Sequence, residues 1–210
     1  MRKPFVVSLL LCAFAAPVAA QDGFGGSQPR PNPPPPAQGS GYGQRPASGS
    51  NTEAAEGQDF GVAPTDKLHT GGMHGPTPAT IPGGLVITTS GLVAMLANQQ
   101  NRPLILDILG GPEVIPGAIA ASPAAQPGTF SDRTQQEFGG FLQQMTQGNK
   151  ETPIVLYCLS NQCWMSYNAS LRAINMGYRN VLWYRGGIEA WKAAGQQVQS
   201  AQQPQQAPRQ

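Results

Sequence analysis

The sequence predicts an α/β fold with a central, mostly parallel sheet covered by helices on both faces. Between residues 67 and 198, short apolar runs typical of strands alternate with segments in which apolar residues recur at helical spacing. The connections between them are short, as is usual in parallel sheets. The nearly continuous apolar run Leu104–Ile108 suits a strand that is buried on both faces.

The first half of this region supplies two strands and one helix. Leu85–Thr88 is rich in β-formers, and Thr89 or Ser90 can cap a helix that runs to about Gln99. Its buried stripe is expected to consist of Leu92, Val93 and Leu96. After the strand Leu104–Ile108, the chain loosens into a loop with a short strand within Ile115–Ile119.

The second half again alternates strands and helices, and it places a cysteine at the turn between a strand and a helix. Its expected elements are a helix from Ser131 or Asp132 to about Gln147, a strand over Ile154–Tyr157, a helix from Trp164 to Asn175, a strand over Val181–Trp183, and a short helix from Gly186-Gly187 to Gly195. Cys158 therefore lies between a strand and a helix. The first N–H groups of a helix lack intrahelical partners and favour a thiolate, which is the nucleophilic form of cysteine.

The two ends of the chain differ from this region in composition. Residues 1–20 combine a basic start, an apolar core and small residues before Ala20, so they are predicted to be a signal peptide cleaved after Ala20. Residues 21–66 are rich in Pro, Gly and Gln and are predicted to be a disordered linker, and residues 199–210 are rich in Gln and are predicted to be a disordered tail. The folded domain is expected to span residues 67–198, without stable membrane insertion.

Charge and cysteine content bound the function. Cleavage would remove two of the 13 basic residues, Arg2 and Lys3, and leave as many bases as the 11 acids. A neutral chain without a basic patch does not indicate a nucleic-acid partner. The mature protein would keep only Cys158 and Cys163, and two close thiols in an oxidising compartment are expected to form a disulfide.

These motifs together resemble a rhodanese-like domain. The resemblance rests on the Cys158 loop between strand and helix, on Met176-Gly177-Tyr178, on Gly186-Gly187-Ile188-Glu189-Ala190-Trp191, and on two upstream segments, Leu104–Asp107 and Ile115–Ile119. A closer resemblance is to exported rhodanese-like proteins named for a CXXCW motif and associated with pyrroloquinoline-quinone-dependent catabolism. It rests on Thr77–Gly83, on Cys163–Ala169, and on Trp183-Tyr184 with Gly186-Gly187. The two cysteines here are separated by four residues and match the first and last positions of a six-residue rhodanese loop.

The resemblance implies sulfur transfer through a persulfide on Cys158. The backbone N–H groups from Leu159 to Trp164 would stabilise the anionic persulfide, much as an oxyanion hole stabilises an alkoxide. The expected reactive residues are Cys158 and Cys163, and the expected substrate- or anion-binding residues are Leu159, Ser160, Asn161, Gln162, Trp164 and Arg185. A small sulfur donor or a thiol acceptor would be the partner, and no cofactor is expected.

The charge of the residues near this loop indicates which sulfur donors the protein can use. Leu159–Cys163 contains no Lys or Arg, so we expect poor turnover of thiosulfate. Arg185 is the nearest candidate cation, although a solvent-facing position is expected for it. Asp107 is expected to have a structural hydrogen-bonding role. A metal site from Cys158, Cys163, His69 and His74 is not predicted, because the spacing is unsuitable and the histidines precede the fold in a Gly-rich, flexible stretch.

Two alternatives to sulfur transfer stay open. The first is a thiol–disulfide redox module in which Cys158 attacks and Cys163 resolves, and its inert counterpart is a static disulfide. The second is a periplasmic accessory without turnover, which the resemblance would pair with an exported dehydrogenase or its cytochrome. Its docking surface would use the aromatic residues Trp164, Tyr167, Trp183, Tyr184 and Trp191. Otherwise Trp183 and Trp191 are expected in the core, with Trp164 covering the loop.

Overall fold

The computed structural model describes residues 48–201. The expected signal peptide, the first part of the expected linker and residues 202–210 lie outside the described residues. Within residues 48–201, no helix is long and apolar enough to cross a membrane.

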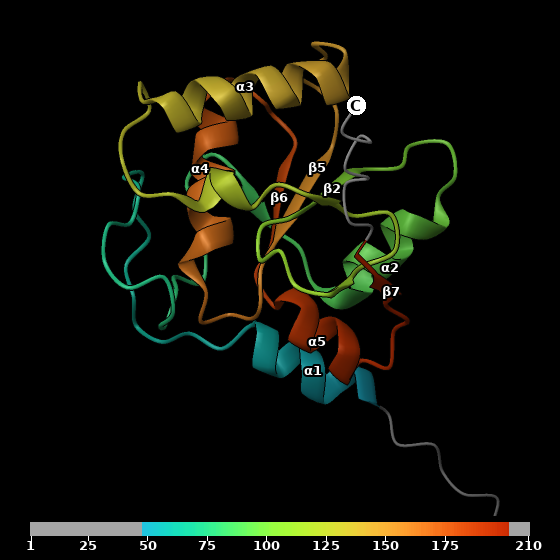
Figure 1. Cartoon of the computed structure of the whole chain (residues 1–210). Coiled ribbons are helices and arrows are strands. Elements are labelled where there is room, and N and C mark those ends of the chain that lie inside the picture. The colour runs from blue at the N-terminus through green and yellow to red at the C-terminus, as the bar shows by residue number, and fades with distance from the viewer. Residues whose placement is uncertain (1–47, 202–210) are drawn as a thin grey trace, which may run out of the picture. The chain divides into compact units, whose positions relative to one another are not determined.

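The centre of the molecule is a five-stranded sheet in which every neighbouring pair of strands is parallel (Figure 1). The strand order is β1-β6-β5-β2-β4. The strands span β1 Leu85–Val86, β6 Val181–Tyr184, β5 Ile154–Tyr157, β2 Leu104–Asp107 and β4 Ile119–Ala120. The parallel sheet confirms the predicted α/β class, and β5 lies in its middle.

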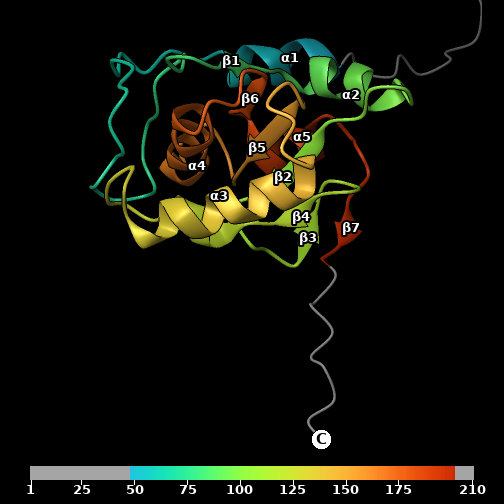
Figure 2. The ribbon, with the colours of Figure 1, turned by 90° about the horizontal axis from the view of Figure 1, so that it is seen from above.

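Helices cover both faces of this sheet, as Figure 2 shows from above. On one face lie α3 (Arg133–Thr146), α4 (Trp164–Asn175) and the short 3-10 helix η1 (Ser122–Ala125). On the other face lie α2 (Thr89–Ala97) and α5 (Gly187–Ala193).

Strand β5 shows how the sequence produces these two layers. Successive side chains of a strand point to opposite faces of its sheet. Accordingly, Ile154 and Leu156 pack in the cluster with α3 and α4, whereas Val155 and Tyr157 pack in the cluster with α2 and α5. All four side chains are fully buried, which explains why the strand appears in the sequence as a continuous apolar run.

Helix starts agree with the predicted caps except in one case. Asp132 caps α3 by accepting a hydrogen bond from the Gln135 N–H, as expected. For α2, however, the cap is Thr88, whose Oγ1 accepts from the Gly91 N–H, rather than Thr89 or Ser90. Thr89 is the first helical residue, so its own N–H is available to another partner.

The predicted tail begins too early. Gln199–Ser200 forms strand β7, which pairs antiparallel with β3 (Glu113–Val114) in a separate two-stranded sheet. Composition alone did not indicate this pairing, because backbone hydrogen bonds need no particular side chains.

The predicted linker is wrong over its last part. Residues 48–66 are not a free tether: Ser48–Glu56 forms helix α1, which packs against α2 and α5 (Figure 1). We call residues 48–82 the N-terminal strap. Leu68 and Ile81 from the strap are buried in a third core cluster with Trp164, Tyr167 and Trp183. The few apolar residues of the strap therefore find a ready-made surface on the sheet domain, which a count of its own apolar residues does not reveal.

Candidate functional site

Cys158 lies at the carboxyl end of the central strand, where α/β sheets commonly bind ligands. Asp107 ends the neighbouring strand β2, and Arg185 follows β6 on the other side. The Asp107 carboxylate accepts hydrogen bonds from the N–H groups of Leu109 (3.0 Å) and Gly110 (3.1 Å). It thereby closes the turn after β2, which matches its predicted structural role. Burial raises the pKa of Asp107, and the two backbone hydrogen bonds oppose that rise.

Cys158 and Cys163 are joined by a disulfide whose Cα atoms lie 6.3 Å apart. This distance lies within the range of roughly 4.4–6.8 Å that is usual for disulfides, and the bond agrees with the expected pairing. The two cysteines are only 1% and 0% exposed. Cys163 is the N-cap residue of α4, so it stands closer to the helix N-terminus than Cys158 does.

The loop between the cysteines is held by its carbonyl groups. The Cys158 and Leu159 carbonyls accept hydrogen bonds from the N–H groups of Ile188 and Glu189 in α5, both at 3.0 Å. This close approach requires glycine at position 187, because φ there is +65° and a Cβ would lie 2.5 Å from the Cys158 carbonyl oxygen. The N-terminus of α5 therefore fixes the first turn of the loop.

The N-terminal strap holds the second half of the loop. The Gln162 carbonyl accepts from the Gly75 N–H, and the Trp164 N–H donates to the Met73 carbonyl, so His74 forms an antiparallel bridge with Cys163. The Asn161 carbonyl accepts from Thr77 Oγ1 at 2.6 Å. The loop is thus enclosed between α5 and the strap.

This arrangement leaves N–H groups of the loop free. In a trans peptide, the N–H points opposite to the carbonyl of the same unit. Because the carbonyls of Cys158, Leu159 and Gln162 are tied outward to α5 and the strap, the N–H groups of Leu159, Ser160 and Cys163 face the opposite way. Within residues 48–201, no group accepts a hydrogen bond from these three donors. Two other expected donors are engaged: the Gln162 N–H donates to Ser160 Oγ at 3.4 Å, and the Trp164 N–H donates to the strap.

Arg185 differs from its expected solvent-facing position, because it is only 2% exposed. Its guanidinium donates to Thr77 Oγ1, to the Thr77 carbonyl and to the Glu56 carbonyl, at 2.7–3.1 Å. Burial lowers the pKa of Arg185, and the nearby charge of Asp59 opposes that effect. The side chain anchors the strap with all three of its nitrogen atoms, and the strap was missing from the predicted domain.

Glu56, at the end of α1, forms a second anchor that the sequence analysis missed. Its carboxylate accepts from the Thr89 N–H and hydroxyl at the N-terminus of α2, where negative charge is favoured. Tyr184, the last residue of β6, contacts both the Thr89 hydroxyl (2.5 Å) and the Glu56 carboxylate (3.4 Å). Burial raises the pKa of Tyr184, so this phenol remains protonated. The run of helix-favouring residues from Glu53 to Glu56 is the one sequence signal for α1.

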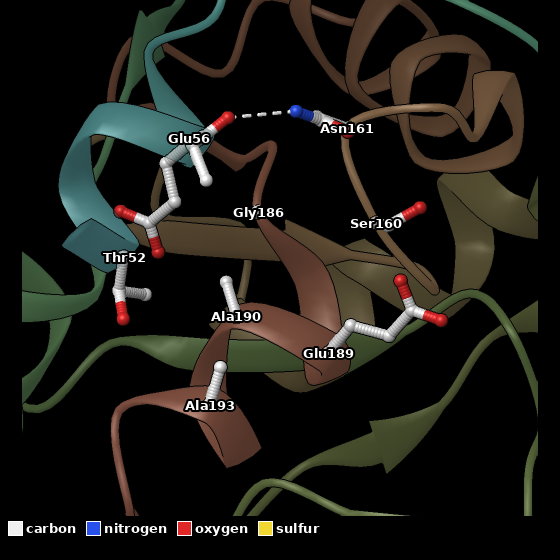
Figure 3. A pocket seen from close by; sticks show the side chains of 9 residues that line it. Thr52, Glu56, Ser160, Asn161, Gly186, Glu189, Ala190 and Ala193 are labelled. Atoms are coloured by element: carbon white, nitrogen blue, oxygen red, sulfur yellow. Dashed lines mark hydrogen bonds between the residues drawn. The ribbon is translucent and has the colours of Figure 1, made fainter. Parts of the chain in front are cut away.

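A pocket of about 370 Å³ opens beside the loop (Figure 3). Its lining comes from α1, the cysteine loop and the length of α5 with its N-cap, and consists of Thr52, Ala55, Glu56, Ser160, Asn161, Gly186, Glu189, Ala190 and Ala193. The dashed line in Figure 3 is the hydrogen bond from the Asn161 amide to the Ala55 carbonyl, at 2.8 Å. The charged groups of this lining are two carboxylates and no cation.

The five aromatic residues considered for docking are all at least 93% buried. Trp164 stacks on His69 of the strap with ring centroids 4.1 Å apart, and it meets Tyr167 edge-on. The histidines do not lie in a flexible stretch, since His69 and His74 belong to the ordered strap. Within residues 48–201, no three His, Cys, Asp or Glu side chains are grouped so that they could hold a metal ion.

Comparison with known proteins agrees with this architecture. Residues 91–194 match the family model of the rhodanese-like domain. The chain therefore carries a rhodanese-like domain with the rhodanese fold, and the strap and β1 precede the matched region.

Solved structures similar to this chain include three of low sequence identity. A thiosulfate sulfurtransferase from Pseudomonas aeruginosa is 22% identical over 57% of this chain and 21% of its own, with a TM-score of 0.43. A rhodanese-like domain from Anabaena is 20% identical over 59% of this chain and 87% of its own, with a TM-score of 0.40. A protein from Bacillus halodurans is 21% identical over 55% and 77%, with a TM-score of 0.42. No curated protein matches the chain significantly.

Proposed function

We propose that this protein is an exported sulfurtransferase that carries sulfur as a persulfide on Cys158. The observation that carries the proposal is the loop itself. A cysteine at the end of the central strand of a rhodanese-like domain begins a loop in which three N–H groups have no partner among the described residues. Such donors stabilise an anionic sulfur.

The chemistry has two steps and begins from the reduced protein. The Cys158 thiolate attacks the outer sulfur of a donor persulfide, the donor's S–S bond breaks, and the donor leaves as a thiolate. A thiophilic acceptor then attacks the outer sulfur of the Cys158 persulfide and displaces the Cys158 thiolate. The disulfide must be opened first, because it occupies the Cys158 sulfur. An external dithiol would supply the two electrons.

The charge of the site suggests the class of donor. The charged residues of the adjacent pocket are Glu56 and Glu189. The guanidinium of the nearby Arg185 already donates its hydrogen bonds to the strap. A dianion such as thiosulfate would enter without a compensating cation, which is costly. An alkyl persulfide of low charge fits this environment better.

The periplasm is the proposed location, and a dehydrogenase or cytochrome of the quinone-dependent type is the proposed partner. The location is supported by the expected signal peptide and by the disulfide, since such bonds persist in oxidising compartments. The partner rests on the resemblance of Thr77–Gly83 and Cys163–Ala169 to the CXXCW proteins.

A second candidate function is thiol–disulfide exchange, favoured by the observed bond between Cys158 and Cys163. It predicts that the wild type oxidises a dithiol peptide stoichiometrically and that either single substitution, Cys158→Ser or Cys163→Ser, abolishes this reaction. A static bridge predicts that physiological dithiols leave the disulfide intact.

The test of sulfur transfer uses the Cys163→Ser variant, in which this disulfide cannot form. After treatment with an alkyl persulfide, its intact mass is expected to increase by one sulfur atom, and cyanide is expected to remove that atom as thiocyanate. Thiosulfate should load the variant much more slowly. The double variant Cys158→Ser/Cys163→Ser should gain no sulfur. Equal loading of the single and double variants would disprove the proposal.

A further inference from the structure

We propose that Cys163 is a resolving thiol that discharges the Cys158 persulfide as hydrogen sulfide. This inference rests on the proposed persulfide function and assigns the fate of its sulfur. The protein would then act as a persulfide reductase, and the disulfide in the structure would be the product state of its catalytic cycle.

The first argument is the identity of the sulfur that Cys163 reaches. In the persulfide, the inner sulfur is Cys158 Sγ and the outer sulfur is the cargo. In the structure, Cys163 Sγ is bonded to Cys158 Sγ, with the two Cα atoms 6.3 Å apart. The loop backbone therefore allows attack on the inner sulfur, which expels the cargo. Attack on the outer sulfur would merely move the cargo to Cys163.

The second argument is the electrostatic position of Cys163. It caps α4, a helix of 12 residues, and its side chain is not used for a capping hydrogen bond. The unpaired N–H groups and the dipole at a helix N-terminus favour a thiolate there. Cys158 directly follows strand β5, five residues before Cys163, and is not the cap of α4. Cys163 is therefore placed where a resolving thiolate would be stabilised.

The third argument is confinement. The Gly75 and Trp164 hydrogen bonds flank Cys163 on both sides, and the α5 hydrogen bonds hold the Cys158 and Leu159 carbonyls. Both cysteines are at least 99% buried under these contacts. An external acceptor must reach the persulfide from solution, whereas Cys163 is already in place. Intramolecular attack gains the high effective concentration of a positioned group.

The step is balanced without an additional oxidant or reductant. The Cys163 thiolate forms a bond to Cys158 Sγ, the bond between the inner and outer sulfurs breaks, and the outer sulfur leaves with the bonding electron pair. One proton from the persulfide or from water yields hydrogen sulfide ion. An external dithiol then reduces the disulfide through two exchange steps and becomes a disulfide itself. The net reaction is reduction of a sulfane sulfur by a dithiol.

The experiment is a single turnover of the pre-reduced, desalted protein with one equivalent of an alkyl persulfide and no other thiol. Released sulfide is trapped with monobromobimane, and intact mass is measured after alkylation. For the wild type we expect one equivalent of sulfide beyond the reagent blank and a protein that has lost two hydrogens and resists alkylation. Cys163→Ser should keep the extra sulfur and release at least tenfold less sulfide. Met145→Ala, at an exposed position on α3, should behave as the wild type.

The outcomes separate the two proposals. If Cys163→Ser gains one sulfur and the wild type also retains it without forming the disulfide, the resolving role is overturned and the persulfide function stands. If neither Cys163→Ser nor Cys163→Ala gains sulfur that depends on Cys158, although both fold by circular dichroism, the persulfide function fails as well. Release of equal sulfide by wild type and Cys163→Ser would also overturn the resolving role.

Discussion

The sheet domain and the N-terminal strap are stabilised by different kinds of interaction. Residues 85–200 bury continuous apolar runs between helix layers, so their stability comes mainly from packing. The strap, residues 48–82, has little regular structure beyond α1, and besides the buried Leu68 and Ile81 it is attached through hydrogen bonds between side chains and backbone. Arg185, Tyr167 and Asn168 of the sheet domain each bind strap backbone in this way. The comparison teaches that a segment without a core of its own can still be ordered by polar groups that a neighbouring core presents.

The largest expected effect comes from breaking the sheet domain. Leu156 is fully buried in the central strand. Leu156→Ala should lower the free energy of unfolding by about 2–5 kcal/mol, because it removes buried methyl groups and leaves a cavity. Urea unfolding followed by far-ultraviolet circular dichroism measures this loss. A loss below about 1 kcal/mol would mean that this layer is not the main source of stability.

A smaller effect is expected from detaching the strap at Arg185. Arg185→Met keeps most of the apolar stem but removes the donors to Thr77 and Glu56. We expect about 1.5–3 kcal/mol of lost stability, the usual range for hydrogen bonds that involve a charged group. The disulfide should also be reduced several-fold faster by a dithiol, since the strap shields it. Arg133→Met, which removes an exposed ion pair, is the matched control and should change neither quantity. An unchanged reduction rate in Arg185→Met would show that the strap does not shield the cysteines.

A still smaller loss of stability is expected from substitution of Asn168. Its side-chain amide pairs with the strap by accepting from the His69 N–H (2.7 Å) and donating to the His69 carbonyl (2.9 Å). Asn168→Ala should cost about 1–2 kcal/mol, because it removes these two neutral hydrogen bonds and a longer third one to the Ala125 carbonyl. In native-state hydrogen exchange, the substitution should accelerate exchange of the His69 amide more than exchange of the Leu156 amide, relative to the wild type. Equal acceleration at both amides would argue against independent opening of the strap.

The smallest effect concerns acid and belongs to the sheet domain. The Arg172 guanidinium pairs with Asp132 at 2.9 Å and holds the pKa of that carboxyl well below its ordinary value of 3.8. A carboxyl whose pKa is lowered on folding stabilises the protein above its unfolded pKa, and that stability is lost as pH falls through the folded pKa. Asp107, whose pKa is raised by burial, contributes with the opposite sign.

Asp132→Asn should therefore flatten the fall in stability below about pH 4. Thermal unfolding of the variant and wild type between pH 2 and pH 6 provides the measurement, with buffer ionic strength held constant. If the two curves remain parallel over this range, Asp132 is not the group responsible.

The sheet domain could be predicted because its signals are local. The strand Ile154–Tyr157 and the helix Trp164–Asn175 were placed with the correct bounds. Hydrophobic periodicity reports burial against the chain's own layers. The strap and β7 were missed because their partners lie far away in sequence and are backbone groups. The approach of Cys158 to Cys163 could be predicted from the loop, whereas the burial of Arg185 depends on strap contacts that no short window contains.

The stacking of Trp164 on His69 has a practical consequence for watching the strap. The rings are nearly parallel, with an angle of 11° between them, and one belongs to the strap while the other begins α4. Indole emission responds to the loss of a stacked neighbour. Trp183 shares the third core cluster with Leu68 and Ile81 of the strap and should respond as well, whereas Trp191 packs in the cluster with α2 and α5 and provides the background. The protein therefore contains its own optical reporter, through which release of the strap can be timed in a stopped-flow mixer without any attached dye.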